Sequence, residues 1–243
     1  MFLSEVNILL ISFDLLITLC FGPHVRFFPI LRKITLEHQP VYMNNYAVNK
    51  ITETLRYGTG FLIALTVILI LSPLIIIMTI LIKISGTGPV IYSQDRIGKN
   101  GKPFMIYKFR SMKYDAETGE PMLSGLGQER ITRIGRFIRK YRIDEIPNFL
   151  NILKGDMTLV GPRPERKFFI DQLEKRVPEI IELQKIKPGI TSWGEIKYGY
   201  ASNVDQMVER LRYDLYYLKH RSLLFDLKIV ILTIGTIIRG EGL

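Results

Sequence analysis

The chain has 243 residues, a net charge of +10, 47% hydrophobic residues and one cysteine. The lone Cys20 excludes an intrachain disulfide, and the three histidines lie too far apart to show the spacing of a metal site. The positive charge suits anionic membrane lipid, a polyphosphate ligand or nucleic acid. Nucleic acid is not an expected partner, because the basic patterns interleaved with aromatic residues that are typical of RNA-binding modules are absent.

The first apolar run, residues 6–21, is short and has Asp14 at its centre. A spanning helix needs about 20 apolar residues, and a central carboxylate costs about 2.5 kcal/mol or more. A marginal span, an interfacial helix and the remainder of a longer membrane region therefore stay open. The acidic start of the chain does not predict a cleaved signal peptide. A proline-containing linker follows, and we treat residues 1–50 as an N-terminal apolar segment and linker.

The second apolar run, residues 61–82, carries no charge and is long enough to cross a bilayer. Ser72 and Pro73 stand at its centre, and the missing proline donor predicts a kink or break there. A kinked spanning helix and a re-entrant hairpin are the two interpretations; in the second, Ser72 would satisfy carbonyls freed by the break. Basic residues on both flanks favour the re-entrant form over residues 51–85. Residues 86–243 would then form a cytoplasmic domain.

That domain opens with two short strands around an Asn100-Gly101 turn, which predicts a β-hairpin. Lys108 and Arg110 are two residues apart, so on a strand they share a face and could hold an anion together; a solvated face is the alternative. An acidic, glycine-rich stretch, 114–128, reads as a loop. Residues 129–141 then form a basic amphipathic helix that packs on a core or lies on anionic headgroups.

An adjacent acid pair, Asp144 and Glu145, precedes Pro147, which favours the first turn of a helix. At a helix N-terminus the dipole keeps carboxylates ionised, and free amides can hold phosphate oxygens. Plain capping acids are the alternative interpretation. Two interpretations fit Asp156 equally well: a residue that caps a turn, and a participant in the chemistry of the site.

Several motifs in order resemble the bacterial sugar transferase family, the monotopic polyprenyl-phosphate phosphoglycosyl transferases. The resemblance covers about residues 50–240 and assigns the Ser72-Pro73 break to the family's re-entrant helix. The matching elements are Lys108-Phe109-Arg110-Ser111-Met112, Arg139 with Asp144-Glu145-x-Pro147, Gly155-Asp156-Met157, Pro162-Arg163-Pro164, Pro188-Gly189-Ile190-Thr191, Arg212-Tyr213-Asp214 and Asp226-Leu227-Lys228.

The resemblance implies a two-step transfer at the cytoplasmic face of the bacterial inner membrane. Asp144 would attack the β-phosphate of a nucleotide-sugar donor, expel UMP and form an aspartyl-phosphosugar, which polyprenyl (undecaprenyl) phosphate would then attack. Glu145 would bind Mg²⁺ or act as a base, and Arg139 and Arg163 would clamp phosphates.

The resemblance also places Lys108 and Asp214 in the family's site, with Arg110 beside Lys108 in its motif. The expected fold is α+β: a mostly helical monotopic membrane protein with the broken re-entrant helix, a short β-hairpin and interfacial amphipathic helices. One of these is the terminal run, residues 229–238, which is too short to span. The sugar and the oligomeric state, including a homodimer, stay open.

This chain departs from the family where many members have Gly-Trp-Ala-Gln and it has Ser192-Trp193-Gly194-Glu195. The change places an extra acid near the presumed nucleotide pocket. A hypothesis from a different class is a non-catalytic membrane adaptor, whose basic surface recruits anionic lipid while the acids only cap a helix.

Overall fold

The computed structural model describes residues 50–113 and 128–242. The predicted N-terminal segment lies outside the described residues except for Lys50, and so does the predicted loop 114–128 except for Gln128. The part of the chain that the structure describes is mostly helical, with two small two-stranded sheets. These features agree with the expected α+β class.

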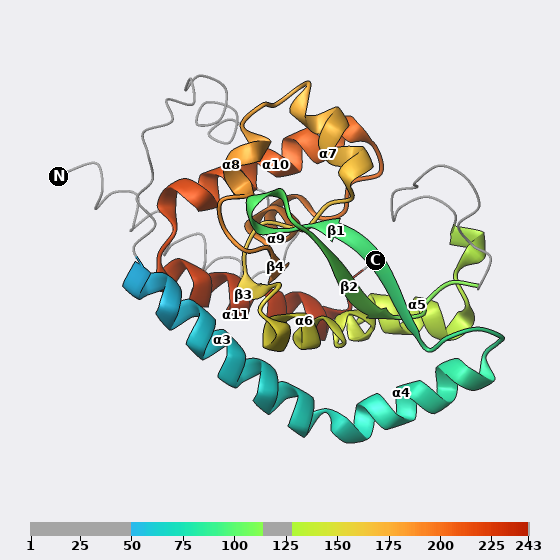
Figure 1. The fold of residues 1–243 in the computed structure, drawn as a ribbon. Coiled ribbons are helices and arrows are strands. Elements are labelled where there is room, and N and C mark those ends of the chain that lie inside the picture. The colour runs from blue at the N-terminus through green and yellow to red at the C-terminus, as the bar shows by residue number, and fades with distance from the viewer. Residues whose placement is uncertain (1–49, 114–127, 243) are drawn as a thin grey trace, which may run out of the picture. The chain divides into compact units, whose positions relative to one another are not determined.

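Two apolar helices, α3 (Lys50–Ile70) and α4 (Ser72–Ile84), meet at the predicted break. Pro73 stands in the first turn of α4, where its missing amide donor is not needed. The Ser72 hydroxyl donates a hydrogen bond of 2.8 Å to the carbonyl oxygen of Leu69. Figure 1 shows the two helices as separate segments that change direction at this point. The helix is therefore interrupted at the predicted position, and the Ser72 hydroxyl binds a carbonyl oxygen next to the interruption.

Most side chains of this apolar pair point away from the rest of the protein. α3 is long and apolar enough to cross a membrane, and α4 is a shorter apolar helix. One stripe of α3 is buried against the rest of the protein. Within it, Gly60 lies against Ile152 and Leu159. Such an exposed apolar band is characteristic of a surface that contacts lipid or protein. The residues at least 60% exposed include Leu62, Leu69, Ile70, Ile76 and Ile84.

The predicted hairpin is confirmed. β1 (Ile91–Ile97) pairs antiparallel with β2 (Pro103–Phe109) through the short 3-10 turn η1 (Lys99–Gly101). Asn100 and Gly101 both adopt the left-handed conformation, with φ of 57° and 71°, which is why an Asn-Gly pair suits this turn. The register places Lys108 opposite Tyr92, near the end of β2 that leads toward the acid pair.

After residue 127, η2 (Gln128–Arg130) precedes the basic helix α5 (Arg133–Lys140). This helix starts later than the predicted 129–141 because the Thr132 hydroxyl caps it, accepting a hydrogen bond of 2.9 Å from the amide of Gly135. Gly135 is required by a close approach: a Cβ there would lie 1.8 Å from the carbonyl oxygen of Ser111. α5 is followed by η3 (Ile143–Glu145) and α6 (Asn148–Lys154).

A second sheet was not predicted. β3 (Thr158–Val160) and β4 (Gly189–Thr191) form a parallel pair of three-residue strands. Their backbones approach closely: a Cβ on Gly189 would lie 2.1 Å from the amide nitrogen of Gly161. This pairing brings the turn that carries Arg163 next to the segment leading into α9 (Trp193–Tyr198), a helix that the sequence did not predict either.

The remaining helices confirm the predicted helical stretches. α7 (Lys167–Glu174) and α8 (Ile180–Leu183) flank Pro178, and α10 (Val204–His220) matches the expected helix at residues 203–221. α11 (Leu223–Arg239) starts earlier than the predicted run at residue 229. Its Ile229 is fully buried, whereas Leu224 and Ile238 are 80% and 74% exposed, so one face packs on the protein and another stays apolar and open.

Three apolar clusters connect these elements. The largest joins α7, α8, α10 and α11; a second joins α4 to β2 and α5; a third joins α3 to β2 and α6. The last two clusters lie on the elements that precede and follow η3 in the chain. The apolar helix pair is therefore packed directly onto the frame of the acid pair.

Candidate active site

The acid pair lies in η3, a 3-10 turn between α5 and α6. Arg142 begins this turn with φ of 52°, a left-handed conformation that residues other than glycine rarely adopt. Pro147 then stands at the N-cap of α6. The predicted position of the acids before a helix is confirmed. Asp144 and Glu145 are nevertheless only 8% and 5% exposed, whereas capping acids are ordinarily solvated.

Glu145 is surrounded by cations. Lys108 Nζ lies 2.5 Å from Glu145 Oε1, Arg142 Nη1 lies 3.5 Å from Oε2, and Arg163 Nη1 lies 3.9 Å from Oε1. Burial alone would raise the pKa of Glu145, but these cations, Lys108 first, lower it to about 2. Glu145 is therefore ionised at any physiological pH.

Asp144 behaves in the opposite way. Burial and the adjacent charge of Glu145 raise the pKa of Asp144 to about 6, against the opposing charges of Lys108, Arg139 and Arg142. Arg139 also has a buried Nη1 atom without a hydrogen-bond partner among the described residues. The two neighbouring acids thus differ in proton affinity and can do different chemistry.

A third buried acid faces the same arginines from α9. Arg163 Nη1 contacts Glu195 Oε1 directly, and Arg142 Nη1 lies 3.4 Å from the same oxygen. The ring of Tyr200 lies 5.3 Å from the Arg142 guanidinium carbon and 5.6 Å from that of Arg163, so it contacts both cations. Burial would lower the pKa of Arg163, but Glu195 and Glu145 raise it and keep the guanidinium charged.

Only part of this group is predicted from the sequence. Glu195 is recognisable there as an extra acid, whereas Arg142 and Tyr200 were not predicted. Arg142 stands two positions before Asp144, and this proximity could have identified Arg142 as a site residue. The signal is obscured because Arg142 belongs to a run of basic residues. No comparable signal marks Tyr200, because only the fold brings α9 and the following turn to η3.

A polar pocket lies beside Glu145. Cations reach it from β1, β2 and the turn before Glu165, and Arg96 on β1 is fixed there by donating to the carbonyl of Pro164 at 3.1 Å. Three cations around a single acid make this pocket suited to an anion such as a phosphate group. The lining residues are Arg96, Ile106, Lys108, Glu145, Asn148, Met157, Arg163, Pro164, Gly189 and Ile190.

Arg110 does not join Lys108, so the predicted joint hold on an anion is wrong. β2 ends at Phe109, and the alternation that would align the two side chains ends with it. The Arg110 guanidinium instead donates to the carbonyl oxygens of Ile82, Gly86 and Thr87 at 2.6 to 2.8 Å. It stabilises the C-terminal end of α4, where orphan carbonyls favour a cation.

Asp214 lies behind the site on α10. Its Oδ1 accepts a hydrogen bond of 2.8 Å from the amide of Gly194, at the start of the helix that carries Glu195. Burial raises the pKa of Asp214 to about 6 although the Gly194 amide opposes this. Asp156 accepts from the Asn151 side chain at 3.3 Å, a contact within the turn after α6.

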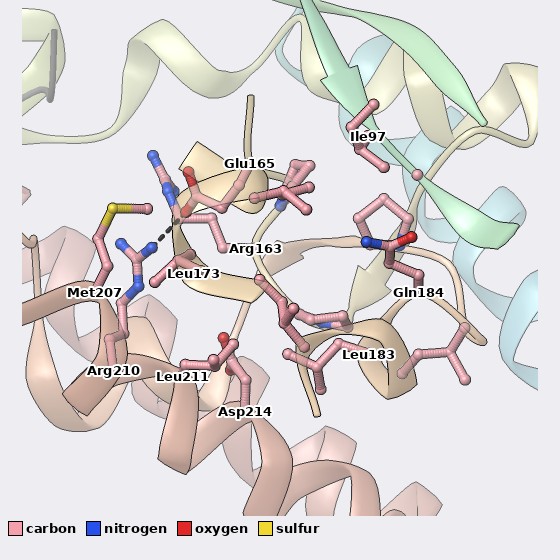
Figure 2. Close-up of a pocket in the computed structure, with 17 residues that line it drawn as sticks. Ile97, Arg163, Glu165, Leu173, Leu183, Gln184, Met207, Arg210, Leu211 and Asp214 are labelled. Atoms are coloured by element: carbon pink, nitrogen blue, oxygen red, sulfur yellow. Dashed lines mark hydrogen bonds and ion pairs between the residues drawn. The ribbon is translucent and has the colours of Figure 1, made fainter. Parts of the chain in front are cut away.

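A separate cavity of about 40 Å³ lies between α7, α8 and α10 and the turn that carries Arg163. Figure 2 shows Arg210, Leu211 and Asp214 along α10 facing this turn, with Glu165 paired to Arg210. The cavity is lined mainly by core residues. Its polar residues hold the turn in place, so that Arg163 can reach Glu145 and Glu195 on the other side.

The acids in the described residues do not form a closed metal cage. In residues 50–113 and 128–242 there is no group of three or more His, Cys, Asp or Glu side chains that could hold a metal ion. Mg²⁺ in phosphate-transfer sites is commonly held by one or two carboxylates together with phosphates and water. Asp144 and Glu145 fit an ion that arrives with a phosphate ligand.

Comparison with known proteins matches residues 51–240 to the family described as bacterial sugar transferase. A UDP-N-acetylgalactosamine-undecaprenyl-phosphate N-acetylgalactosaminephosphotransferase of Aeromonas hydrophila is 42% identical over 77% of this chain and 44% of its own. A UDP-glucose:undecaprenyl-phosphate glucose-1-phosphate transferase of Escherichia coli is 34% identical over 76% and 40%, and the galactosyl transferase CpsE of Streptococcus agalactiae is 40% identical over 64% and 36%. The chain thus spans less than half the length of each of these relatives. Because the family match covers most of the chain, including the whole acid and arginine cluster, the chain belongs to the bacterial sugar transferase family.

Proposed function

We propose that this chain transfers a sugar-1-phosphate from a UDP-sugar to undecaprenyl phosphate and so starts assembly of an exopolysaccharide, O-antigen or other glycoconjugate. The observation that carries the proposal is the buried Asp144, held beside an ionised Glu145 among Lys108, Arg139 and Arg142. The names of the relatives support the acceptor, since two of them are undecaprenyl-phosphate transferases with different UDP-sugars.

In the first step, a carboxylate oxygen of Asp144 attacks the β-phosphorus of the donor. The bond between this phosphorus and the bridging oxygen breaks, UMP leaves with that oxygen, and an aspartyl-phosphosugar remains on the protein. The attack brings a carboxylate toward an anionic diphosphate. Lys108, Arg139 and Arg163 offset this repulsion and hold the phosphate oxygens, as positioning and charge stabilisation require in phosphoryl transfer.

In the second step, an oxygen of undecaprenyl phosphate attacks the same phosphorus. The bond to the Asp144 oxygen breaks, the carboxylate is regenerated, and the sugar leaves as undecaprenyl-diphosphosugar. Both steps exchange one phosphorus–oxygen bond for another, so no redox partner is needed. Glu145 stays ionised throughout because its cationic neighbours hold its proton affinity down.

Mg²⁺ belongs to this proposal as a partner of Glu145. When bound, it supplies positive charge that offsets the charge of the diphosphate. The protein's own part is to keep the Glu145 carboxylate ionised and within reach of the phosphate pocket.

The membrane arrangement is also part of the proposal. The broken pair α3 and α4 would enter the inner membrane from the cytoplasmic side and return, while α5 and α11 lie on its anionic surface. The exposed apolar side chains of α3, α4 and α11 support this arrangement. In a Cys20→Ser background, single cysteines at Lys50 and Ser85 should both react only from the cytoplasmic side. Labelling of either one from outside the cell would contradict the re-entrant form.

The test of the chemistry is release of UMP from a panel of UDP-sugars, with undecaprenyl phosphate and Mg²⁺. The wild type should release UMP, and Asp144→Asn should abolish release because an amide cannot form the acyl phosphate. Asp156→Asn is the matched control and should keep activity, since Asp156 contacts only the turn at Asn151 in the hydrogen bonds of the described structure. A wild type that binds anionic vesicles but releases no UMP would favour the membrane adaptor instead.

A further inference from the structure

Glu195 is an acid in contact with Arg163, one of the cations that line the pocket proposed to bind phosphate. Its side chain is only 2% exposed, and its Oε1 atom binds both Arg142 and Arg163. The other oxygen, Oε2, is buried and has no hydrogen-bond partner in the part of the chain that the structure describes. A buried charge ordinarily has every hydrogen bond satisfied, so a purely structural role leaves this carboxylate poorly explained.

The position of Glu195 is fixed by its own backbone. Ser192 caps α9 by accepting a hydrogen bond of 3.0 Å from the amide of Glu195, and Asp214 accepts one of 2.8 Å from Gly194. Gly194 leaves no space for movement, since a Cβ there would lie 2.9 Å from the Asp214 carboxylate and from Arg210. The backbone of Glu195 is therefore fixed, and Arg142 and Arg163 hold its carboxylate.

The two arginines are shared between two acids. Arg142 lies 3.5 Å from Glu145 and 3.4 Å from Glu195, and Arg163 contacts Glu195 more closely than it contacts Glu145, at 3.9 Å. The acids and arginines thus alternate in a closed ring. A phosphate that enters the pocket beside Glu145 has to compete with Glu195 for Arg163.

We infer that Glu195 is a positioning residue that partly neutralises Arg163 and Arg142 and thereby limits how tightly the pocket holds the phosphates of the donor and of the released UMP. The inference rests on the proposed function. It follows from the sign of the charge: a fixed carboxylate next to the cations that bind an anion weakens the attraction for that anion. A limit on affinity favours turnover, because the nucleotide product shares the phosphate contacts of the donor.

The test is calorimetric binding of UMP and of inorganic pyrophosphate to the purified full chain in detergent. Glu195→Gln keeps the shape and one acceptor for Arg163 but removes the charge, so both anions should bind about tenfold more tightly. Glu195→Asp keeps the charge but withdraws it by one methylene, so binding should tighten two- to threefold. A merely structural role predicts the reverse, since a disturbed site binds ligands more weakly. Thermal unfolding establishes that each variant folds, and Glu195→Asp alone decides the matter if Glu195→Gln does not fold.

Glu53 provides a matched control outside the site. It is also a buried glutamate that binds two arginines, Arg56 at 2.8 Å and Arg221 at 2.7 Å. Glu53→Gln should leave the affinity for both anions within twofold of the wild type. If the wild type binds neither anion, the proposed function fails together with this inference. If the wild type binds them and the Glu195 variants bind equally or more weakly, only the inference about Glu195 is overturned.

Discussion

Replacing Asp144 by Asn should stabilise the protein while abolishing its activity. The buried carboxylate has a pKa of about 6 in the folded protein and an ordinary value of 3.8, so the folded state holds its proton more tightly than the unfolded state does. At pH 7.5 the ionised form is therefore less favourable in the folded protein by about 3 kcal/mol. Asparagine removes this term because it has no charge to bury.

The net gain is smaller than this figure. The side-chain amide of the Asp144→Asn variant introduces N–H donors among cations, and a donor without an acceptor costs about 1 kcal/mol or more. A net gain of about 2 kcal/mol corresponds to a rise in Tm of about 4 °C or more for a chain of this size. The penalty in the wild type is fully present above pH 6 and declines as pH falls toward 3.8. At pH 5 about half of it remains, so the difference in Tm should shrink accordingly.

The assay is thermal unfolding of the wild type and Asp144→Asn in detergent at pH 7.5 and pH 5. Asp156→Asn should not reproduce the stabilisation, because Asp156 is half-buried and hydrogen-bonded within a turn. An unchanged or lower Tm for Asp144→Asn at pH 7.5 would refute the reasoning. So would an increase that is equally large at pH 5.

Three further variants test the surrounding contacts. Lys108→Met removes the cation nearest to Glu145 and should lower UMP release about a hundredfold or more, with a weaker affinity for pyrophosphate by calorimetry. Arg110→Met leaves the carbonyl oxygens at the end of α4 without their donor and should lower the free energy of unfolding by about 3 kcal/mol, measured by denaturant titration. Asp226→Ala removes the closer of the two acids that bind the buried Arg56, at 2.5 Å, and leaves Glu53 at 2.8 Å, so it should cost about 2 kcal/mol by the same measurement, without a change in pyrophosphate affinity per folded molecule.

The parts of the fold that the sequence predicts are those with a local cause. Pro73 ends one helix and begins another whatever surrounds it, and Asn100-Gly101 favours its turn through backbone conformation alone. The acid pair was recognisable because Pro147 marks a helix start directly after it. Each of these features depends on neighbours within a few residues.

The features that the sequence missed depend on distant contacts. β3 and β4 have only three residues each and form because Gly161 and Gly189 let the backbones approach, about thirty residues apart. Arg110 was misplaced because nothing local shows that β2 ends at Phe109 and that its guanidinium meets the end of α4. The contact of Glu195 with Arg163 likewise exists only after this second sheet has formed.

The apolar helices are attached to the charged domain by buried arginines as well as by apolar packing. Arg56 on α3 binds Asp226 of α11 at 2.5 Å, while Arg110 holds the end of α4. A buried ion pair holds α3, and hydrogen bonds from a buried guanidinium hold α4; both kinds of contact are costly to break when one partner is removed. Contacts within the protein therefore support the arrangement of α3 and α4. These contacts and the apolar packing of α3 and α4 on β2, α5 and α6 hold the apolar band at a set distance from Asp144, as the proposed transfer from a water-soluble donor to a lipid acceptor would require.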